Sequence, residues 1–469
     1  MTIRKIRGGE PLGRLIRLRR LLFVAVVPAF LLLAVINQLD LSHLLSPIHW
    51  AVVCATVGFA PVVLSVSRRQ FDTFEPIYLM MAYLGFIFGL RGIYLLSIPF
   101  NRLLPFASER LIAAALSLAT LGMLGIYTGY FCGLGDTFAR HLPRLRFLNA
   151  SERRYPRSVI ALATIAGIGA IGFHSFLMSG VSIHDQSSTG GIFLLSPFFD
   201  LLPLAICLVF LNGEGRSFRL GRAVAMFAVY VVICLSFLLF AGKSSLLRPL
   251  FYLLVIFHYR RRKISPVVWP LLGLAFVAAN LAAMCERDFH WNLAATQSYV
   301  FAHSHSWTAL WELLFSRFYG LEALVVVLAR VQHSGLLLGR NYMELLYWFV
   351  PRFLWAGKPL TWSYQWGYLF AEYTRWGEGD FVATTLFGDF YLNFGLWGLL
   401  VGSALIGVIA RIAYVYLIEL IGTKSAIVMY AVVLMLLELR LEGGLPEAVE
   451  LSVTELAAVT VVLAASAVV

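Results

Sequence analysis

Hydrophobic runs of about 20 residues recur along most of the chain, separated by short polar segments. A run of that length crosses the hydrocarbon core of a bilayer as an α-helix, so each run predicts a transmembrane helix. The pattern therefore predicts an all-α polytopic membrane protein with about 12 transmembrane helices. The expected spans are residues 21–38, 49–66, 77–98, 111–133, 158–178, 192–211, 223–242, 246–258, 266–284, 395–418, 425–437 and 451–469.

The runs divide the chain unevenly. An N-terminal bundle of about nine spans is followed by one long polar and aromatic segment and by a C-terminal bundle of about three spans. These three parts are residues 1–284, 285–394 and 395–469.

The long segment is not patterned like an ordinary soluble loop. Apolar residues recur at helical spacing between Trp307 and Leu328, which predicts an amphipathic helix on or partly in the membrane interface. Pro351 and Pro359 then interrupt any helix. Irregular backbone at membrane depth is tolerated only where protein buries it or where it lines a cavity. We therefore expect interfacial or re-entrant elements that cover a cavity.

Charge changes the picture by orienting the helices. The 469 residues carry a net charge of +12, but only 13% of them are charged, and the mean hydropathy is +0.81. The first 20 residues hold seven Lys or Arg, whereas the predicted loops 39–48 and 179–191 hold none. By the positive-inside rule both termini are cytoplasmic and segment 285–394 is external. The basic excess is thus mainly a topology signal and an attraction for anionic lipid, not a nucleic-acid site.

Cations gather where the predicted topology should be poor in them. Charges inside spans are costly, so their depth is informative. Residues that fall in the outer half of the membrane or at its outer edge are Arg91, Asp200, Lys243, Arg248 and Arg440. The external segment adds Arg317, Arg330, Arg340, Arg352, Lys358 and Arg375. Arg forks and Lys ammonium groups match phosphate oxygens, and the surroundings are apolar, so the cluster predicts a site for a lipid diphosphate.

Structural roles are the alternative for several of these charges. Arg91 and Asp200 suit a buried ion pair, and Arg411, near the inner end of its span, suits snorkelling. Arg352 and Lys358 differ, because Pro and Trp neighbours restrict their backbone. Residues that suit solvated loop charges are Arg330, Arg340 and Arg375.

Metal and disulfide chemistry are weakly supported. No Asp-x-Asp pair occurs in the external segment, and His303 with His305 is only a weak metal signal. The five cysteines show no paired spacing. The sequence therefore predicts no metal site and no cofactor.

Four strings resemble a known family. The strings are AGKSSLLRPL (241–250), RFYGLEAL (317–324), LLGRNYMELLYWFVPRFLWAGKP (337–359) and GDFVATTLFGDFYLNFGLWG (379–398). They resemble the Wzy-type O-antigen and oligosaccharide repeat-unit polymerases of bacterial O-antigen and exopolysaccharide biosynthesis. The resemblance covers roughly residues 240–420. Where many relatives have Trp-Pro-x-Lys-Pro, this chain has Trp-Ala-Gly-Lys-Pro at 355–359.

The resemblance implies a GT-C-like polytopic membrane glycosyltransferase at the periplasmic face of the bacterial inner (cytoplasmic) membrane. Its substrate would be an undecaprenyl-diphosphate-linked oligosaccharide, with membrane lipid around it and a chain-length regulator and a flippase as protein partners. The resemblance implies a diphosphate site in which Arg352, Lys358 and Arg317 match the cations of the family's loop motif. The family's cation at the junction of two spans is matched by Lys243 or by Arg248. Arg440 joins them on the charge map.

Preorganised cations would stabilise the diphosphate leaving group without a metal, and a general base would deprotonate the acceptor hydroxyl. Asp389, in GDFYLNFG, is the first candidate base, followed by Glu322 and His305.

Three other functions stay open. An O-antigen ligase would share the donor and the charge pattern but transfer the glycan to lipid A-core. A lipid-linked oligosaccharide flippase would need cations through both halves of the membrane, whereas these concentrate in the outer half. A non-enzymatic partner of a polysaccharide complex would leave the buried cations without a task.

Overall fold

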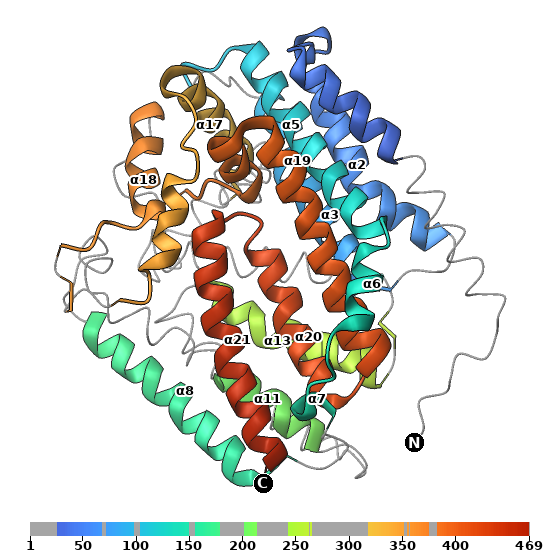
Figure 1. Ribbon diagram of the computed structural model, residues 1–469, viewed down its shortest axis with the longest axis vertical. Helices are drawn as coiled ribbons and strands as arrows, with labels where there is room; N and C mark the ends of the chain where they lie inside the picture. The colour runs from blue at the N-terminus through green and yellow to red at the C-terminus, as the bar shows by residue number, and fades with distance from the viewer. Residues whose placement is uncertain are drawn as a thin grey trace, which may run out of the picture. The chain divides into compact units, whose positions relative to one another are not determined.

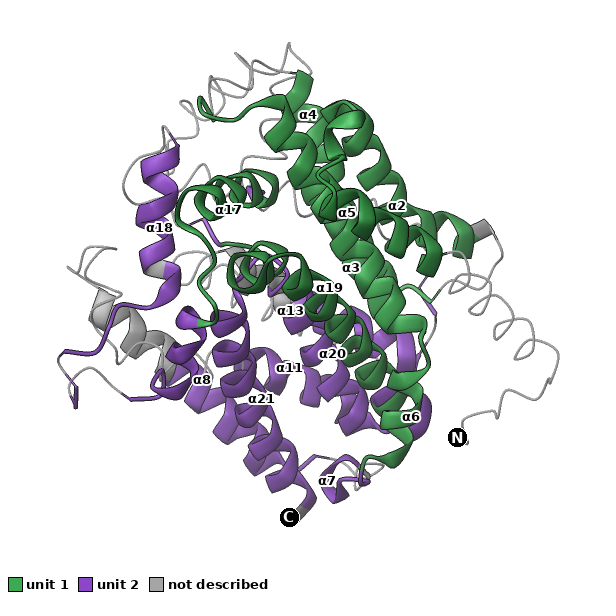
Figure 2. Cartoon of the chain, turned by 45° about the horizontal axis from the view of Figure 1, so that its top comes forward, with its two compact units in different colours: residues 1–142, 320–339, 384–416 green, residues 143–319, 340–383, 417–469 purple. Residues whose placement is uncertain are grey.

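The computed structural model (Figure 1) is all-helical, with no strand, in the part of the chain that it describes. The described residues are 26–67, 72–97, 104–149, 155–178, 201–212, 243–261, 263–264, 318–350, 354–355, 357–374 and 382–468. The chain divides into two units (Figure 2). Unit 1 holds residues 1–142, 320–339 and 384–416, and unit 2 holds residues 143–319, 340–383 and 417–469. Each unit therefore takes residues from all three of the parts expected from the sequence.

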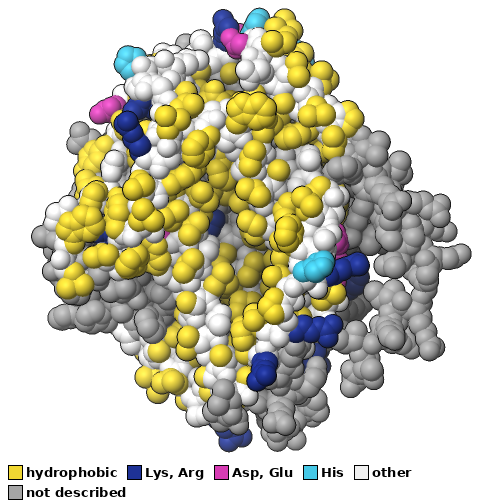
Figure 3. Space-filling model, in the orientation of Figure 1, with side chains coloured by type: hydrophobic (Ala, Val, Ile, Leu, Met, Phe, Trp, Pro, Cys, Tyr) yellow, Lys and Arg dark blue, Asp and Glu magenta, His cyan; other side chains and the backbone are white. Residues whose placement is uncertain are grey.

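Five described helices are long and apolar enough to cross a membrane, as the hydrophobic runs predict. They are Pro47–Val66, Pro76–Ser97, Glu109–Phe131, Leu386–Ile421 and Leu445–Ala467. On the face drawn in Figure 3, hydrophobic side chains are spread over the described residues and charged side chains lie at only a few places. Such a surface suits lipid rather than water, so the chain is a multi-pass membrane protein. The expected spans 223–242 and 266–284 lie outside the described residues.

Unit 1 is built around α5, which is nearly all buried and packs against α2, α17 and α19. The helix begins at a cap, where the hydroxyl of Ser108 accepts a hydrogen bond from Leu111 N (3.3 Å). The described helices of unit 1 are Val26–Gln38, η1 (Ser42–Leu44), α2 (Pro47–Ser67), α3 (Pro76–Leu84), η2 (Gly85–Leu90), α4 (Arg91–Ser97), α5 (Glu109–Phe131), α6 (Leu134–His141), α17 (Gly320–Ser334) and α19 (Leu386–Tyr414).

Unit 2 packs α11 against α8 and α13, and α20 against α13 and α21. A hydrogen-bonded group joins the beginning of α8 to α11 and α20. In it Asn212 exchanges bonds with the backbone of Tyr155, whose hydroxyl lies 3.1 Å from Ser425 Oγ. The described helices of unit 2 are α7 (Arg146–Asn149), α8 (Arg157–Met178), α11 (Leu201–Asn212), α13 (Lys243–Arg260), η4 (Arg340–Leu346), α18 (Trp362–Tyr373), α20 (Lys424–Leu439) and α21 (Leu445–Val468). The π-helical turn η5 (Val415–Ile421) follows α19 across the unit boundary.

Helix α17 differs from the interfacial amphipathic helix expected between Trp307 and Leu328. Its residues from Gly320 to Leu328 are buried on every face, because α5 and α19 pack against it. Helical spacing alone cannot distinguish one covered face from a fully covered helix. The part of the expected helix before Phe318 lies outside the described residues.

Helix α19 is discontinuous. Phe394 and Gly395 depart from helical geometry, and Gly395 has a φ of +62°. The carbonyl groups of Leu392 and Asn393 accept hydrogen bonds from Leu337 N (3.0 Å) and Leu338 N (3.1 Å). The Asn393 side chain adds a bond from Gly339 N (3.0 Å). The segment after α17 thus satisfies backbone groups that the break leaves without helical partners.

Small residues let α5 and α19 approach closely. A Cβ added at Gly129 would fall on the carbonyl oxygen of Ala404, and one added at Gly407 would fall on that of Ile126. The far side of α19 carries exposed apolar residues at four-residue spacing, among them Trp397, Val401 and Leu405. One face therefore packs backbone to backbone, and the other suits lipid.

We expect Gly407→Val to destabilise the protein strongly, since the obstacle is backbone and cannot rotate away. Overpacking costs about 1–3 kcal/mol, and a backbone clash lies at the upper end. Thermal unfolding of the purified protein in detergent measures the loss. Gly169→Val is the matched control, because nothing lies within 4 Å of a Cβ at that position in α8. Equal unfolding temperatures for the two variants would contradict the close α5–α19 packing.

Candidate functional site

The aromatic segment between η4 and α18 is held by Lys358. Its ammonium donates hydrogen bonds to the carbonyl oxygens of Trp348 (2.8 Å) and Val350 (3.0 Å). The same Nζ lies 6.0 Å from the centre of the Tyr347 ring, a cation–π distance. The Tyr347 ring also meets Trp355 edge to face. Lys358 therefore holds the backbone of Trp348 and Val350 and places a positive charge among aromatic rings.

A buried carboxylate lies beside this lysine. Glu344 Oε2 accepts a hydrogen bond from Trp362 N (2.8 Å) at the first residue of α18. Burial raises the pKa of Glu344 above its ordinary value of 4.5, and the nearby charge of Glu447 raises it further. The bond from Trp362 N and the charge of Lys358 oppose that rise in pKa. A carboxylate in such surroundings is suited to accept a proton nearer neutral pH than an exposed glutamate.

Two more carboxylates come from the beginning of α21. Ser363 Oγ donates to Glu447 Oε2 (3.2 Å), and Glu450 interacts electrostatically with Glu344 and Lys358. Lys358, Glu344, Glu447 and Glu450 are named the acid–lysine cluster below. All four belong to unit 2. The cluster combines a fixed cation with several possible proton acceptors, as general-base chemistry at an anionic leaving group requires.

The other predicted diphosphate-binding residues differ in how far the structure describes them. Arg440, the C-cap of α20, donates to Glu455 Oε1 in α21 (3.1 Å), so a carboxylate balances its charge. Lys243 and Arg248 lie in the first turns of α13, and their side chains lie outside the described part. The predicted residues that lie wholly outside the described ranges are Arg317, Arg352 and His305.

Glu322, a candidate base, is paired in unit 1. Arg91 Nε donates to its Oε1 (3.1 Å), a second guanidinium nitrogen of Arg91 bonds the same oxygen, and both side chains are buried. Asp200, the partner considered from the sequence for Arg91, lies outside the described residues. The other oxygen of Glu322, Oε2, has no hydrogen bond among the described residues. The arrangement matches a structural ion pair between α4 and α17.

Asp389, the first candidate base, lies in the short first half of α19 and is fully buried. Asn393 Nδ2 donates to the Asp389 carbonyl oxygen (2.9 Å) and lies 3.5 Å from its carboxylate Oδ1. The helix start is capped by Thr385, whose hydroxyl accepts from Gly388 N (3.1 Å) although Thr385 itself has a φ of +62°. The Asn-Phe-Gly string is therefore explained by the end of this half-helix.

The prediction that Arg411 snorkels is wrong. Its side chain is 1% exposed, and it makes two bonds to Asp136, from Nη2 to Oδ1 (2.7 Å) and from Nε to Oδ2 (3.2 Å). Glu75 Oε1 lies 3.8 Å from Nη1. Carboxylates from α6 and from the residue before α3 meet the guanidinium inside unit 1, so it has no need to reach the membrane surface.

Sequence reasoning did not assign roles to Glu344, Glu447 or Glu450. Glu447 and Glu450 lie three residues apart and therefore share a face of α21. They precede the expected span 451–469, at the end that the topology places outside with segment 285–394. Their predicted external position, which Lys358 shares, is the signal from which the sequence could have placed them near Lys358.

Comparisons with protein-family models, curated protein sequences and solved structures found no match to this chain. The family resemblance of the strings between residues 241 and 398 therefore stays a prediction.

Single substitutions in the Arg91–Glu322 pair should destabilise unit 1, and the double substitution should recover most of the loss. Glu322→Leu or Arg91→Met leaves one buried charge unpaired, which should lower the free energy of unfolding by about 3–5 kcal/mol. The double variant removes both charges and keeps apolar volume. Thermal unfolding of the four proteins in detergent measures the coupling. A double variant as unstable as either single variant would contradict a structural pair.

Proposed function

We propose that the chain is an integral membrane glycosyltransferase that joins undecaprenyl-diphosphate-linked oligosaccharide repeat units at the periplasmic face of the bacterial inner membrane. The observation that carries the proposal is the acid–lysine cluster, in which Lys358 and the buried Glu344 lie together. Both residues belong to the string 337–359 that resembles the Wzy-type polymerases.

The proposed reaction transfers a glycan between two lipid-linked units. The bond between the anomeric carbon and the diphosphate oxygen breaks, and undecaprenyl diphosphate leaves with the electron pair. The acceptor hydroxyl oxygen forms the new glycosidic bond, and its proton passes to a carboxylate. Glu344 is our candidate for that carboxylate, and Asp389 stays the alternative base. The positive charge of Lys358 would stabilise the negative charge that develops on the leaving group.

The contacts within each unit support the predicted topology. In unit 2, Ser363 bonds Glu447, and both belong to segments predicted to be external. In unit 1, Arg110 forms an ion pair with Asp40 across two predicted external loops. Segments that must share one side of the membrane thus meet in the structure.

Reconstitution gives the direct test of the proposed reaction. Purified protein in liposomes, supplied with lipid-linked repeat units, should produce a ladder of longer glycans on gel electrophoresis. Transfer only onto added lipid A-core would indicate an O-antigen ligase. Movement of lipid-linked units across the bilayer without a new glycosidic bond would indicate a flippase. Either of the last two results would contradict the polymerase proposal.

Glu344→Gln should nearly abolish polymer formation while the protein still folds. The amide oxygen of Gln can accept the bond from Trp362 N, but it cannot take the acceptor proton; loss of a general base costs about 10²–10⁴-fold in rate. Because the pKa of Glu344 is raised, the wild-type rate should fall as pH decreases toward a midpoint above 4.5.

The pH profile separates a chemical role for Glu344 from a structural one. Glu372→Gln, on the exposed side of α18, is the matched control and should keep the wild-type rate and profile. Normal polymer from Glu344→Gln, or an unchanged acidic limb in that variant, would remove Glu344 as the base.

A further inference from the structure

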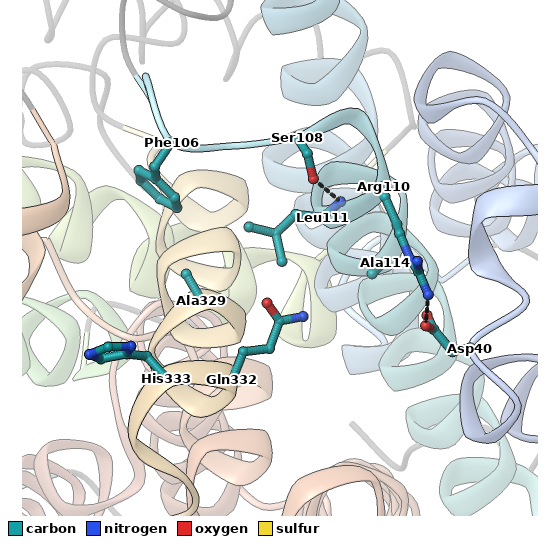
Figure 4. A pocket seen from close by; sticks show the side chains of 9 residues that line it. All are labelled: Asp40, Phe106, Ser108, Arg110, Leu111, Ala114, Ala329, Gln332 and His333. Atoms are coloured by element: carbon teal, nitrogen blue, oxygen red, sulfur yellow. Dashed lines mark hydrogen bonds and ion pairs between the residues drawn. The ribbon is translucent and has the colours of Figure 1, made fainter.

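A pocket of about 570 Å³ lies in unit 1, between the beginning of α5 and the last turns of α17 (Figure 4). Its volume falls within the range of small-molecule sites, about 300–1,000 Å³. None of its lining residues belongs to the acid–lysine cluster. They are Asp40, Phe106, Ser108, Arg110, Leu111, Ala114, Ala329, Gln332 and His333.

The charges of the pocket cancel. Arg110 and Asp40 form an ion pair, and the side chains are 62% and 59% exposed. The neighbouring Ser108 hydroxyl caps α5 through Leu111 N. A phosphate or another strong anion would find its cation already paired, so the pocket suits a neutral ligand with hydroxyl groups.

Gln332 brings a hydrogen-bonding group without a partner among the described residues to the same space. Figure 4 shows Gln332 extending from α17 toward α5, whereas His333 points to the other side of α17. The Gln332 amide offers two donors and an acceptor, and it bonds no residue that the structure describes. Together with the outer atoms of Arg110 and Asp40, it supplies both donors and acceptors at the pocket mouth.

Apolar groups complete the wall. Phe106 is 36% exposed and lies above Ala329 in Figure 4, with Leu111 across the gap. An aromatic face beside mixed donors and acceptors is what a pyranose ring requires, because one side of the ring is apolar C–H and its edge carries hydroxyls.

The pocket lies at the end of unit 1 that the topology places outside. Helix α5 begins at the pocket and ends next to α6, which carries Asp136. Six arginines follow in the sequence between residues 140 and 157, and such basic loops are cytoplasmic. A glycan presented at the periplasmic face would therefore reach the pocket from its own side of the membrane.

We propose that this pocket binds one neutral sugar residue of the lipid-linked glycan. The proposal rests on the proposed function for its biological role. It goes further by naming Gln332, Phe106 and the Arg110–Asp40 pair as a sugar subsite, none of whose residues belongs to the acid–lysine cluster.

Binding of free sugars tests the subsite without any lipid diphosphate. Saturation-transfer NMR on the purified full chain in detergent would use glucose, galactose, mannose, rhamnose, N-acetylglucosamine and N-acetylgalactosamine, with inorganic phosphate and glucuronate as anionic probes. We expect at least one neutral sugar to bind. Gln332→Ala should weaken that binding roughly tenfold, as the loss of a hydrogen bond does. Ala329→Trp should abolish it by filling the pocket.

Ser334→Ala and Ser334→Trp are the matched controls, because Ser334 is exposed on the same turn of α17 and does not line the pocket. Both should bind sugar as the wild type does. Absence of binding by every neutral sugar, binding of the anionic probes alone, or equal binding by Gln332→Ala and the wild type would each overturn the proposal. Polymer formation by the wild type is measured separately. Sugar binding without polymer formation would contradict the proposed function alone, and polymer formation without sugar binding would contradict the sugar subsite alone.

Discussion

The pairing of buried charges is the constraint on which the described structure depends. Water cannot solvate a guanidinium inside a helical bundle in lipid, so each arginine there requires a carboxylate from another helix. Unit 1 meets this requirement twice, with Arg91 on Glu322 and with Arg411 on Asp136. Unit 2 meets it with Arg440 on Glu455. Each pair links separate elements of the bundle. The hydrophobic effect does not drive helices together inside a bilayer, because lipid tails are as apolar as the side chains, so these ion pairs supply part of the attraction.

The break in α19 follows the same logic for backbone groups. The carbonyls of Leu392 and Asn393 lose helical partners at the kink and receive amides from Leu337 and Leu338. The segment that supplies these amides follows α17, so the position of α17 and the shape of α19 depend on each other. Asp389 and Glu322 are buried in this region of unit 1, whereas Lys358 and Glu344 belong to unit 2. The candidate bases thus differ in surroundings. Glu322 is paired with Arg91 and Asp389 is bonded by Asn393, whereas Glu344 lies near Lys358 and accepts a bond from Trp362 N.

Hydrophobic runs predicted the helices well, because length and composition are local properties. The spans expected at 49–66, 77–98 and 111–133 correspond to α2, to α3 with α4, and to α5. Pairing partners were not predictable in the same way. Arg411 and Asp136 are separated by 275 residues, and no local pattern marks one as the partner of the other. Likewise, the spacing from Trp307 to Leu328 indicated a helix but could not show that α17 is covered on all faces. In the candidate site, Lys358 was predicted from its Pro and Trp neighbours. The predicted topology placed Glu344 and Glu447 on the same side as Lys358, but their hydrogen bonds to Trp362 and Ser363 were seen only in the folded structure.

The distance along the chain between Arg91 and Glu322 has a consequence for biogenesis. The two residues are 231 positions apart. At ribosomal rates of about 5–20 residues per second, Arg91 is made roughly ten to fifty seconds before its carboxylate. An unpaired arginine within a span costs about 2.5–3.5 kcal/mol on the scale of translocon insertion. Until α17 is synthesised, Arg91 has no Glu322 to pair with, and snorkelling toward a headgroup would lower this cost. Unit 1 is completed later still, because α19 follows α17 in the chain and supplies Arg411 for its pairing with Asp136.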